Sequence, residues 1–439
     1  MGSSTRRWMI VATLFVAIVC NYLDRQLLSV LKPEILQHFG IGNLEYAWIV
    51  NVFLVCYAVM YPVSGLLVDR FGPRRVMLGG IVTWSLACVG GGLCGPGQVV
   101  LFTVFRGILG LAEPTVFASQ FIAVTLWFAR RERATANSLC QNGGAIGAVL
   151  APVTIAALMG WLDAWQHVFF IAGVTGLAIA AVWAFVYRTP APDMLTRTMD
   201  ESTGTDSAPP FPIRRLLRTR TLWGGVLIRL VSDPVWYFCC FWLPGFLRRM
   251  GEREGLSNAQ TLSMIQWIGG LPFLVGAIGA VLASVWSDGL IRRGTPSLRA
   301  RKTVLAFMVA LAPTCALVPM VDGSTLPFGW RVGLVVAAFC LIAVLCNSWL
   351  HTIPVTLIEQ VPVRNGAFVS GCSCGAGALG TIVFYQLVGT IPESAWTSLF
   401  FAMATFHALA ALVLWKMVRP ETVKDDDSPT DMIDKEKRQ

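Results

Sequence analysis

The sequence predicts an all-α membrane protein with twelve transmembrane helices arranged as two six-helix bundles. Of its 439 residues, 55% are apolar or aromatic and only 13% are charged, whereas soluble domains carry roughly 25% charged residues. The charges lie between apolar runs of about 20 residues, a length that spans roughly 30 Å of hydrocarbon. A polar motif also recurs half a chain length apart. So few charges cannot cover a soluble globule of this size, which excludes a water-soluble enzyme and a DNA-binding protein.

The first apolar run follows Arg6 and Arg7, as a secretory signal would. It continues through Asp24 to about Leu31 without a small-residue cleavage site, so we interpret it as a retained first helix. Most of the twelve cysteines fall inside apolar runs without a nearby His cluster, so we expect no disulfide framework, no metal site and no cofactor. The twelve runs have approximate limits of 8–31, 46–68, 76–95, 98–128, 134–159, 166–187, 221–246, 261–286, 302–320, 329–352, 365–389 and 395–417.

The basic residues are distributed asymmetrically. Of 34 Lys and Arg residues, 26 lie at the termini and in the loops after even-numbered helices, five lie in the opposite loops and three lie within helices. Because Lys and Arg favour the cytoplasmic side, we expect both termini in the cytoplasm of a multi-pass protein of the cell inner membrane. The net charge of +9 then reports topology, and no nucleic-acid partner is expected.

A polar, proline-containing segment separates the apolar runs into two groups of six. Its composition is typical of a flexible linker. We predict an N-terminal bundle at 1–188, a cytoplasmic linker at 189–220, a C-terminal bundle at 221–418 and a cytoplasmic polar tail at 419–439.

The two halves share a motif at the end of their second helix. In the first half it runs from Gly65 to Arg75 as GLLVDRFGPRR, and in the second half Asp288 corresponds to Asp69. Parallel six-helix repeats are an architecture of membrane transporters. The first copy resembles the signature between helices 2 and 3 of the major facilitator superfamily, which implies that fold and a gating role. The implied gating residues are Gly65, Asp69, Arg70, Gly72, Arg74 and Asp288.

Helices 5 and 11 each contain Gly-x-x-x-Gly, at Gly143 to Gly147 and at Gly371 to Gly375. This pattern lets helix backbones approach closely. We expect both motifs to make contacts between the two bundles, with packing inside one bundle as the alternative.

Six ionisable residues fall inside predicted helices, where each costs at least about 2.5–3.5 kcal/mol near the bilayer centre. Buried ion pairs stabilise a fold poorly compared with apolar packing, so the two acids and two arginines of the first half indicate a binding site. The pair in helix 7 could contact substrate or only each other. The six are Asp24 and Arg25 in helix 1, Arg106 and Glu113 in helix 4, and Arg229 and Asp233 in helix 7.

Three intramembrane arginines favour an anionic substrate, because guanidinium binds a carboxylate bidentately. Two acids without metal-ligand partners favour protons. In an empty site Arg25 and Arg106 stabilise ionised Asp24 and Glu113. A substrate carboxylate on the arginines offsets this effect and favours protonation, and by linkage protonation favours substrate binding. This is the logic of a proton symporter.

Three stretches resemble the anion:cation symporter family, and within it the hexuronate transporters. They are Asn21–Arg25, Arg106–Pro114 and Ser232–Pro244. The resemblance implies that Arg25 and Arg106 bind the substrate carboxylate, with Asp24 and Glu113 coupling the proton. Tyr22, Tyr57 and Trp349 lie where that family places cavity-lining groups, and Arg229 completes the predicted substrate-binding set.

The chain departs from this family at two places. The family often has an aromatic residue where Cys239 or Cys240 stands, and in helix 11 this chain offers only Ser373 among small residues. Fewer polar groups in helix 11 weaken the case for a highly hydroxylated substrate.

We therefore predict a monomeric, proton-coupled importer of an organic anion, a hexuronate or related sugar acid, that works by alternating access. Its partners would be the anion, the proton and the lipid bilayer. A carrier of aromatic or small monocarboxylates is the first alternative. A membrane sensor without transport is the second, although the short polar linker and tail offer no signalling domain. An enzyme is not expected, because no nucleophile–base–orienter set appears.

Overall fold

The computed structural model describes residues 3–162, 164–190, 210–390 and 396–421, and the regular structure in these ranges is helical. Most of the predicted linker, and the tail from residue 422, lie outside the described residues. The first half consists of α1 (Ser3–Val30), α2 (Lys32–Phe39), α3 (Asn43–Phe71), α4 (Pro73–Gly92), α5 (Val99–Ala112), α6 (Pro114–Trp127), α7 (Arg130–Trp161) and α8 (Trp165–Val186).

The second half is built in the same way. It consists of α10 (Ile213–Leu216), α11 (Arg220–Arg253), α12 (Asn258–Ile268), α13 (Leu271–Arg292), α14 (Ser297–Met308), the 3-10 turn η1 (Val309–Leu311), α15 (Thr314–Asp322), α16 (Phe328–Ile358), α17 (Val363–Thr390) and α18 (Trp396–Met417).

The predicted fold class is confirmed. Each of the twelve apolar runs falls on one helix or on consecutive helices, and within the described ranges eleven spans are long and apolar enough to cross a membrane. The predicted seventh span is α11, which is not among the eleven. With 34 residues it is long enough to cross a membrane, and the count of eleven covers only the described residues, which leave out several side chains in the middle of α11.

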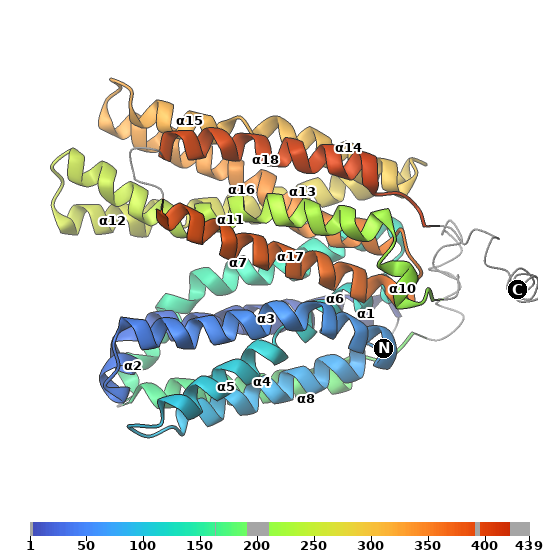
Figure 1. Cartoon of the computed structure of the whole chain (residues 1–439), viewed down its shortest axis with the longest axis horizontal. Helices are drawn as coiled ribbons and strands as arrows, with labels where there is room; N and C mark the ends of the chain where they lie inside the picture. Colours follow the sequence, from blue (N-terminus) through green and yellow to red (C-terminus); the bar gives the residue numbers. More distant parts are fainter. Residues whose placement is uncertain (1–2, 163, 191–209, 391–395, 422–439) are drawn as a thin grey trace, which may run out of the picture.

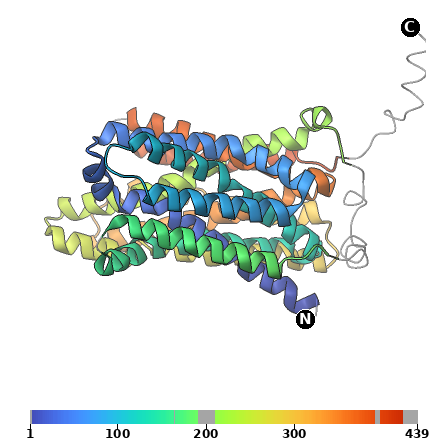
Figure 2. The ribbon, with the colours of Figure 1, turned by 90° about the horizontal axis from the view of Figure 1, so that it is seen from below.

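The helices of each half run side by side along the long axis of the molecule (Figure 1). A view turned by 90° shows the same alignment for the first half (Figure 2). Between the halves, α3 packs against α17 and α7 packs against α13. We call one end of the molecule the basic end: it holds Arg70–Arg75, Arg130–Arg133 and Arg292–Arg301, and the described chain begins and finishes there.

Small residues set how closely the halves approach. A Cβ atom at Gly65 of α3 would lie 2.4 Å from the carbonyl oxygen of Ala367 in α17, and one at Gly371 would lie 2.5 Å from the carbonyl oxygen of Tyr61. The glycines of helix 11 therefore pack between the bundles, as predicted.

The expectation for helix 5 was wrong. A Cβ atom at Gly143 or Gly147 would meet the carbonyl oxygens of Phe15 and Val19, at 2.5 and 2.6 Å, and both belong to α1 of the same half. The motif permits a close backbone contact but does not choose the partner. On α7 the contact with the other half includes the side chain of Asn142, whose Nδ2 donates to the Ala277 carbonyl at 3.0 Å.

Candidate functional site

The site begins at an interruption of helix 4. Pro114 has no N–H to donate to the preceding turn, so the span divides into α5 and α6 with Glu113 between them. Glu113 is fully buried. Gly110, one turn earlier, lets α5 approach α3 closely, because its Cβ position lies 2.5 Å from the Phe53 carbonyl oxygen. The break thus fixes a carboxyl group in the interior beside the aromatic residues of α3.

The guanidinium group of Arg25 occupies this interior. Its Nη2 donates to Glu113 Oε2 at 2.7 Å and to Asn21 Oδ1 at 3.3 Å. The same group lies 4.9 Å from the ring centroid of Tyr22 and 4.5 Å from that of Tyr57. These cation–π contacts hold a planar cation in one orientation inside a low-dielectric region.

Arg106 of α5 is held in a similar way. It is buried, and its guanidinium lies 5.4 Å from the centroid of Phe102 and 4.7 Å from that of Phe169. Coulombic interaction links it to Asp24 and Glu113. The four charges predicted in helices 1 and 4 therefore lie in one cluster, which we call the charge cluster: Asp24, Arg25, Arg106 and Glu113.

Each member of the charge cluster has an atom without a partner. Arg25 Nε, Arg106 Nη2, Asp24 Oδ2 and Glu113 Oε1 are buried and make no hydrogen bond to the described part of the chain. Buried polar atoms are normally paired, and leaving one unpaired costs about 1–3 kcal/mol. The two unpaired nitrogen donors could hydrogen-bond to a carboxylate, and the two unpaired carboxyl oxygens could take up protons. This composition is what an anion-and-proton site requires.

The helix 7 charges form their own pair in the second half. Arg229 Nε lies 2.9 Å from Asp233 Oδ2, and Arg229 Nη1 donates to the Leu350 carbonyl at 2.9 Å. Gly377 of α17 packs directly on this pair, since a Cβ atom there would lie 2.0 Å from Asp233 Oδ2. Tyr237, one turn after Asp233, interacts electrostatically with both Asp233 and Arg25.

The structure does not bring Trp349 to the charge cluster. Its side chain is 1% exposed and packs with Leu305 and His407 inside the second half. Its Nε1 donates to the Leu305 carbonyl at 3.2 Å. Because its one polar group is used within that half, Trp349 has no place in the site as assembled in this conformation. Tyr22 and Tyr57, by contrast, border Arg25.

The repeated acids meet the opposite half at the basic end. Asp69 Oδ1 and Oδ2 accept hydrogen bonds from the backbone N–H groups of Ala367 and Phe368, at 3.1 and 2.9 Å, near the start of α17. Asp288 Oδ2 accepts from Thr135 N and Oγ1 in the first turns of α7, at 2.8 and 2.7 Å. Both acids therefore face the positive end of a helix dipole across the interface.

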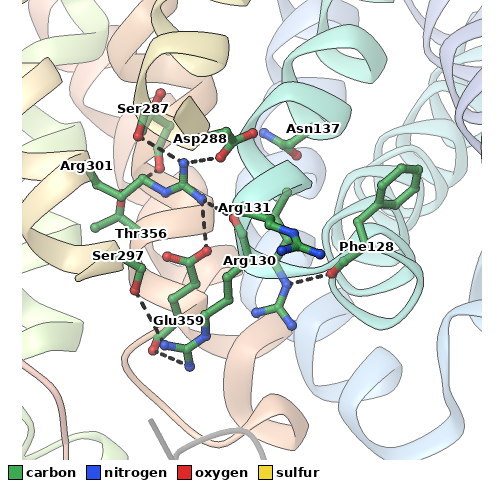
Figure 3. Close-up of polar contacts among 12 residues, drawn as sticks. Phe128, Arg130, Arg131, Asn137, Ser287, Asp288, Ser297, Arg301, Thr356 and Glu359 are labelled. Carbon is green, nitrogen blue, oxygen red and sulfur yellow. Dashed lines mark hydrogen bonds and ion pairs between the residues drawn. The ribbon is translucent and has the colours of Figure 1, made fainter. Parts of the chain in front are cut away.

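Asp288 also belongs to a buried ionic network. Figure 3 shows Arg301 reaching Asp288 and Glu359, with Nη1–Oδ1 and Nη2–Oε1 distances of 2.6 and 3.0 Å. Arg301 Nη2 further donates to the Arg130 carbonyl at 2.9 Å, and Arg130 Nη2 donates to the Glu359 carbonyl at 3.4 Å. The network joins α13, α14 and α16 to the start of α7. It closes the interface at the basic end.

The other residues of the motif have local contacts. Gly72 has a φ of 78°, which a glycine adopts readily at the turn between α3 and α4. Arg74 Nη2 donates to the Ala184 carbonyl of α8 at 3.0 Å, and the Arg70 guanidinium lies over the Phe71 ring at 5.2 Å. Of the predicted gating set, Gly65, Asp69 and Asp288 contact the opposite half, whereas neither Arg70 nor Arg74 forms a hydrogen bond or ion pair with the described residues of that half.

Sequence reasoning missed several polar residues of these two regions. The hydroxyl groups of Tyr61 and Tyr57 form a hydrogen bond of 2.9 Å. Their spacing of four residues on one helix could have predicted this contact. Asn137 of α7 bonds to Gln120 and donates to the His351 carbonyl in the second half at 2.7 Å. Nothing in the sequence pattern distinguished Arg301 and Glu359 as members of a network, because arginine and glutamate are common near the ends of helices.

Fold and site together define a membrane transporter of two six-helix halves. The sequence profile described as Major Facilitator Superfamily matches residues 14–371. A hexuronate transporter of Escherichia coli strain K12 is 25% identical over 435 residues, which covers 94% of each chain. A galacturonate transporter of Dickeya chrysanthemi is 27% identical and covers 63% of this chain and 80% of its own length.

Solved structures agree in architecture. The crystal structure of the E. coli fucose:proton symporter aligns with a TM-score of 0.67 at 14% identity, covering 95% of this chain and 100% of that one. A proton:xylose symporter gives a TM-score of 0.70 at 15% identity, with 95% and 97% covered. Such low identities show the fold alone. Because the family profile spans most of its length, the chain belongs to the Major Facilitator Superfamily, whose members are transporters and not enzymes.

Proposed function

We propose that the protein is a proton-coupled symporter that imports an organic anion, a hexuronate or related sugar acid. The observation that carries this proposal is the charge cluster, in which two arginines and two acids each retain a buried unpaired atom. The names of the relatives, hexuronate and galacturonate transporter, support the substrate class.

The substrate carboxylate would bind Arg25 Nε and Arg106 Nη2. Binding there weakens the attraction between these arginines and Glu113, which now pairs with Arg25 at 2.7 Å. A carboxylate that loses its cation in a low-dielectric interior takes up a proton more readily. Proton and anion therefore bind together. The site that holds both carries less net charge than the site that holds only the anion or only the proton.

Movement would follow from the interface at the basic end. In the present arrangement Asp69 and Asp288 hold the halves together there. Rocking of the halves would break these contacts and expose the site to the side of the basic end, in agreement with alternating access around a central site. We propose that this side is the cytoplasm, since it carries the excess of basic residues.

The test replaces Glu113 by glutamine. In proteoliposomes, Glu113→Gln is expected to exchange labelled glucuronate or galacturonate across the membrane but not to accumulate it under an imposed pH gradient. The amide keeps the shape and can still accept a hydrogen bond from Arg25, but it cannot take up the proton. The matched control is Glu132→Gln, which removes an acid paired with Arg7 at the basic end and outside the charge cluster.

Accumulation by Glu113→Gln equal to that of the unchanged protein would contradict the role of Glu113. An aromatic monocarboxylate is the second candidate substrate, because Tyr22 and Tyr57 border Arg25. Competition of glucuronate uptake by benzoate and by galacturonate separates the two candidates: stronger inhibition by benzoate would favour the aromatic acid.

A further inference from the structure

A basic cleft lies at the basic end, away from the charge cluster. It has a volume of about 430 Å³ and is formed where α10, the start of α11 and the chain after α18 meet. We call it the arginine cleft. It is lined by Arg215, Arg218, Thr219, Arg220, Arg419, Pro420 and Glu421.

Backbone contacts fix the walls of the arginine cleft. Thr219 caps α11 by accepting from Leu222 N at 3.4 Å. Thr221 Oγ1 donates to the Arg419 carbonyl at 2.7 Å and accepts from Arg419 N at 3.2 Å. Glu421 N donates to the Gln360 carbonyl at 3.0 Å. These hydrogen bonds hold the chain after α18 against the first turn of α11. The walls of the cleft are therefore fixed by the fold.

The cleft carries an excess of positive charge. Its lining contains four arginines and one acid, Glu421, whose Oε1 accepts from Thr221 N at 3.2 Å. Arg218, Arg220 and Arg419 are exposed, and none of them forms an ion pair with another described residue. The dipole of α11 adds positive potential at its N-terminus. An anion with several oxygens fits this arrangement.

Exposed aromatic and aliphatic side chains show where the cleft lies relative to the bilayer. Trp223 of α11 is 49% exposed and Trp415 of α18 is 52% exposed. Leu217 and Ile213 are exposed to 46% and 48%. Tryptophan gathers at the level of lipid headgroups. The cleft therefore sits at the membrane surface, with apolar side chains beside it that can meet acyl chains.

We propose that the arginine cleft binds the phosphate headgroup of an anionic glycerophospholipid. Guanidinium groups bind phosphate oxygens bidentately, and basic pockets at this surface attract anionic lipids. A free phosphate shares the headgroup chemistry, but only a lipid could also use the exposed apolar side chains beside the cleft. Because α10 leads from the linker into the second half, the bound lipid would attach this junction to the membrane surface.

Native mass spectrometry of the full-length protein in detergent tests the proposal, with phosphatidylglycerol and phosphatidylcholine as the added lipids. The unchanged protein is expected to retain phosphatidylglycerol preferentially. The triple variant Arg218→Gln, Arg220→Gln, Arg419→Gln should bind it roughly 100-fold more weakly. A charge-matched control is Arg293→Gln, Arg299→Gln, Arg364→Gln, three exposed arginines of the same end, which should retain the lipid.

The single variant Arg419→Gln, expected to lose about 5-fold, covers the case in which the triple variant does not fold. Equal retention of phosphatidylglycerol by the triple variant and its control would overturn the proposal. Arginine-dependent binding of inorganic phosphate without preference for phosphatidylglycerol would assign the cleft to a soluble phosphate and overturn the lipid. A further variant removes the chain after Glu421. If phosphatidylglycerol binds only to this shortened protein, the acidic tail with Asp425, Asp426 and Asp427 would be the occupant of the cleft, and the lipid proposal would be overturned.

Discussion

Several residues in the membrane-spanning helices are both charged and buried, a combination that costs free energy in the interior of a bilayer. Arg25 and Arg106 are each surrounded by aromatic rings on α1, α3, α5 and α8. The rings lie against the guanidinium groups and leave a buried nitrogen of each, Arg25 Nε and Arg106 Nη2, without a hydrogen-bond partner among the described residues. Anion recognition therefore depends on the orientation of the planar group as well as on its charge.

Replacing Arg106 by alanine is expected to lower the affinity for glucuronate by roughly 10- to 150-fold, the equivalent of a charged hydrogen bond of about 1.5–3 kcal/mol. Arg106→Lys keeps the charge but not the planar fork, so it should restore only part of the affinity. Isothermal titration on the purified protein measures both.

Arg253→Ala is the control, because this arginine pairs with Asp322 at the surface opposite the basic end. Unchanged glucuronate binding by Arg106→Ala would remove Arg106 from the site.

At the scale of helices, breaks and close contacts place the residues. Pro114 divides helix 4 and leaves Glu113 at the break, while Gly110 lets α5 approach α3. Between the halves, Gly65 brings α3 within backbone contact of α17, and the Asp69 hydrogen bonds lie one turn further on. The sequence of each helix thus sets both its own shape and the distance to its neighbour.

Substituting Gly65 by alanine should separate α3 from α17 at the basic end. The added methyl group would lie 2.4 Å from the Ala367 carbonyl oxygen, so the packed arrangement is expected to lose about 1–3 kcal/mol. Thermal unfolding in detergent measures the loss. Gly79→Ala in α4 is the matched control, because nothing lies within 4 Å of its Cβ position; a loss of the same size in both variants would contradict this contact.

At the scale of the whole molecule, the two halves hold each other through related contacts. Asp69 of α3 binds the start of α17, and Asp288 of α13 binds the start of α7. The second contact is reinforced by Arg301 and Glu359 in the buried network. Two such contacts related by the repeat resist separation of the halves at the basic end.

The double variant Asp69→Asn, Asp288→Asn is expected to shift the protein toward arrangements open at the basic end. Each change weakens charge-assisted hydrogen bonds that contribute about 1.5–3 kcal/mol. Distances between spin labels at exposed Arg75 and Arg299 report the opening. The labels require unnatural amino acids, because the chain has twelve cysteines.

The single variants serve as controls, and each should open less than the double variant. A distance distribution identical to that of the unchanged protein would show that the two acids do not hold this end closed.

The sequence by itself determined the membrane class, the approximate positions of the membrane spans and the four charged residues that form the charge cluster. Apolar runs and intramembrane charges are local features that are readable one segment at a time, since burying a charge in hydrocarbon is costly wherever it occurs. It left open whether Arg229 and Asp233 contact substrate or pair with each other, and the structure shows the pair that a spacing of four residues on one helix permits.

Only the tertiary structure decided which segments meet. It placed the glycines of helix 5 against α1, kept Trp349 inside the second half, and joined Arg301 and Glu359 to the residues of α7. The physical reason is that contacts between distant segments depend on how whole helix faces pack. No single segment carries that information, and a glycine or a buried arginine fits many partners equally well.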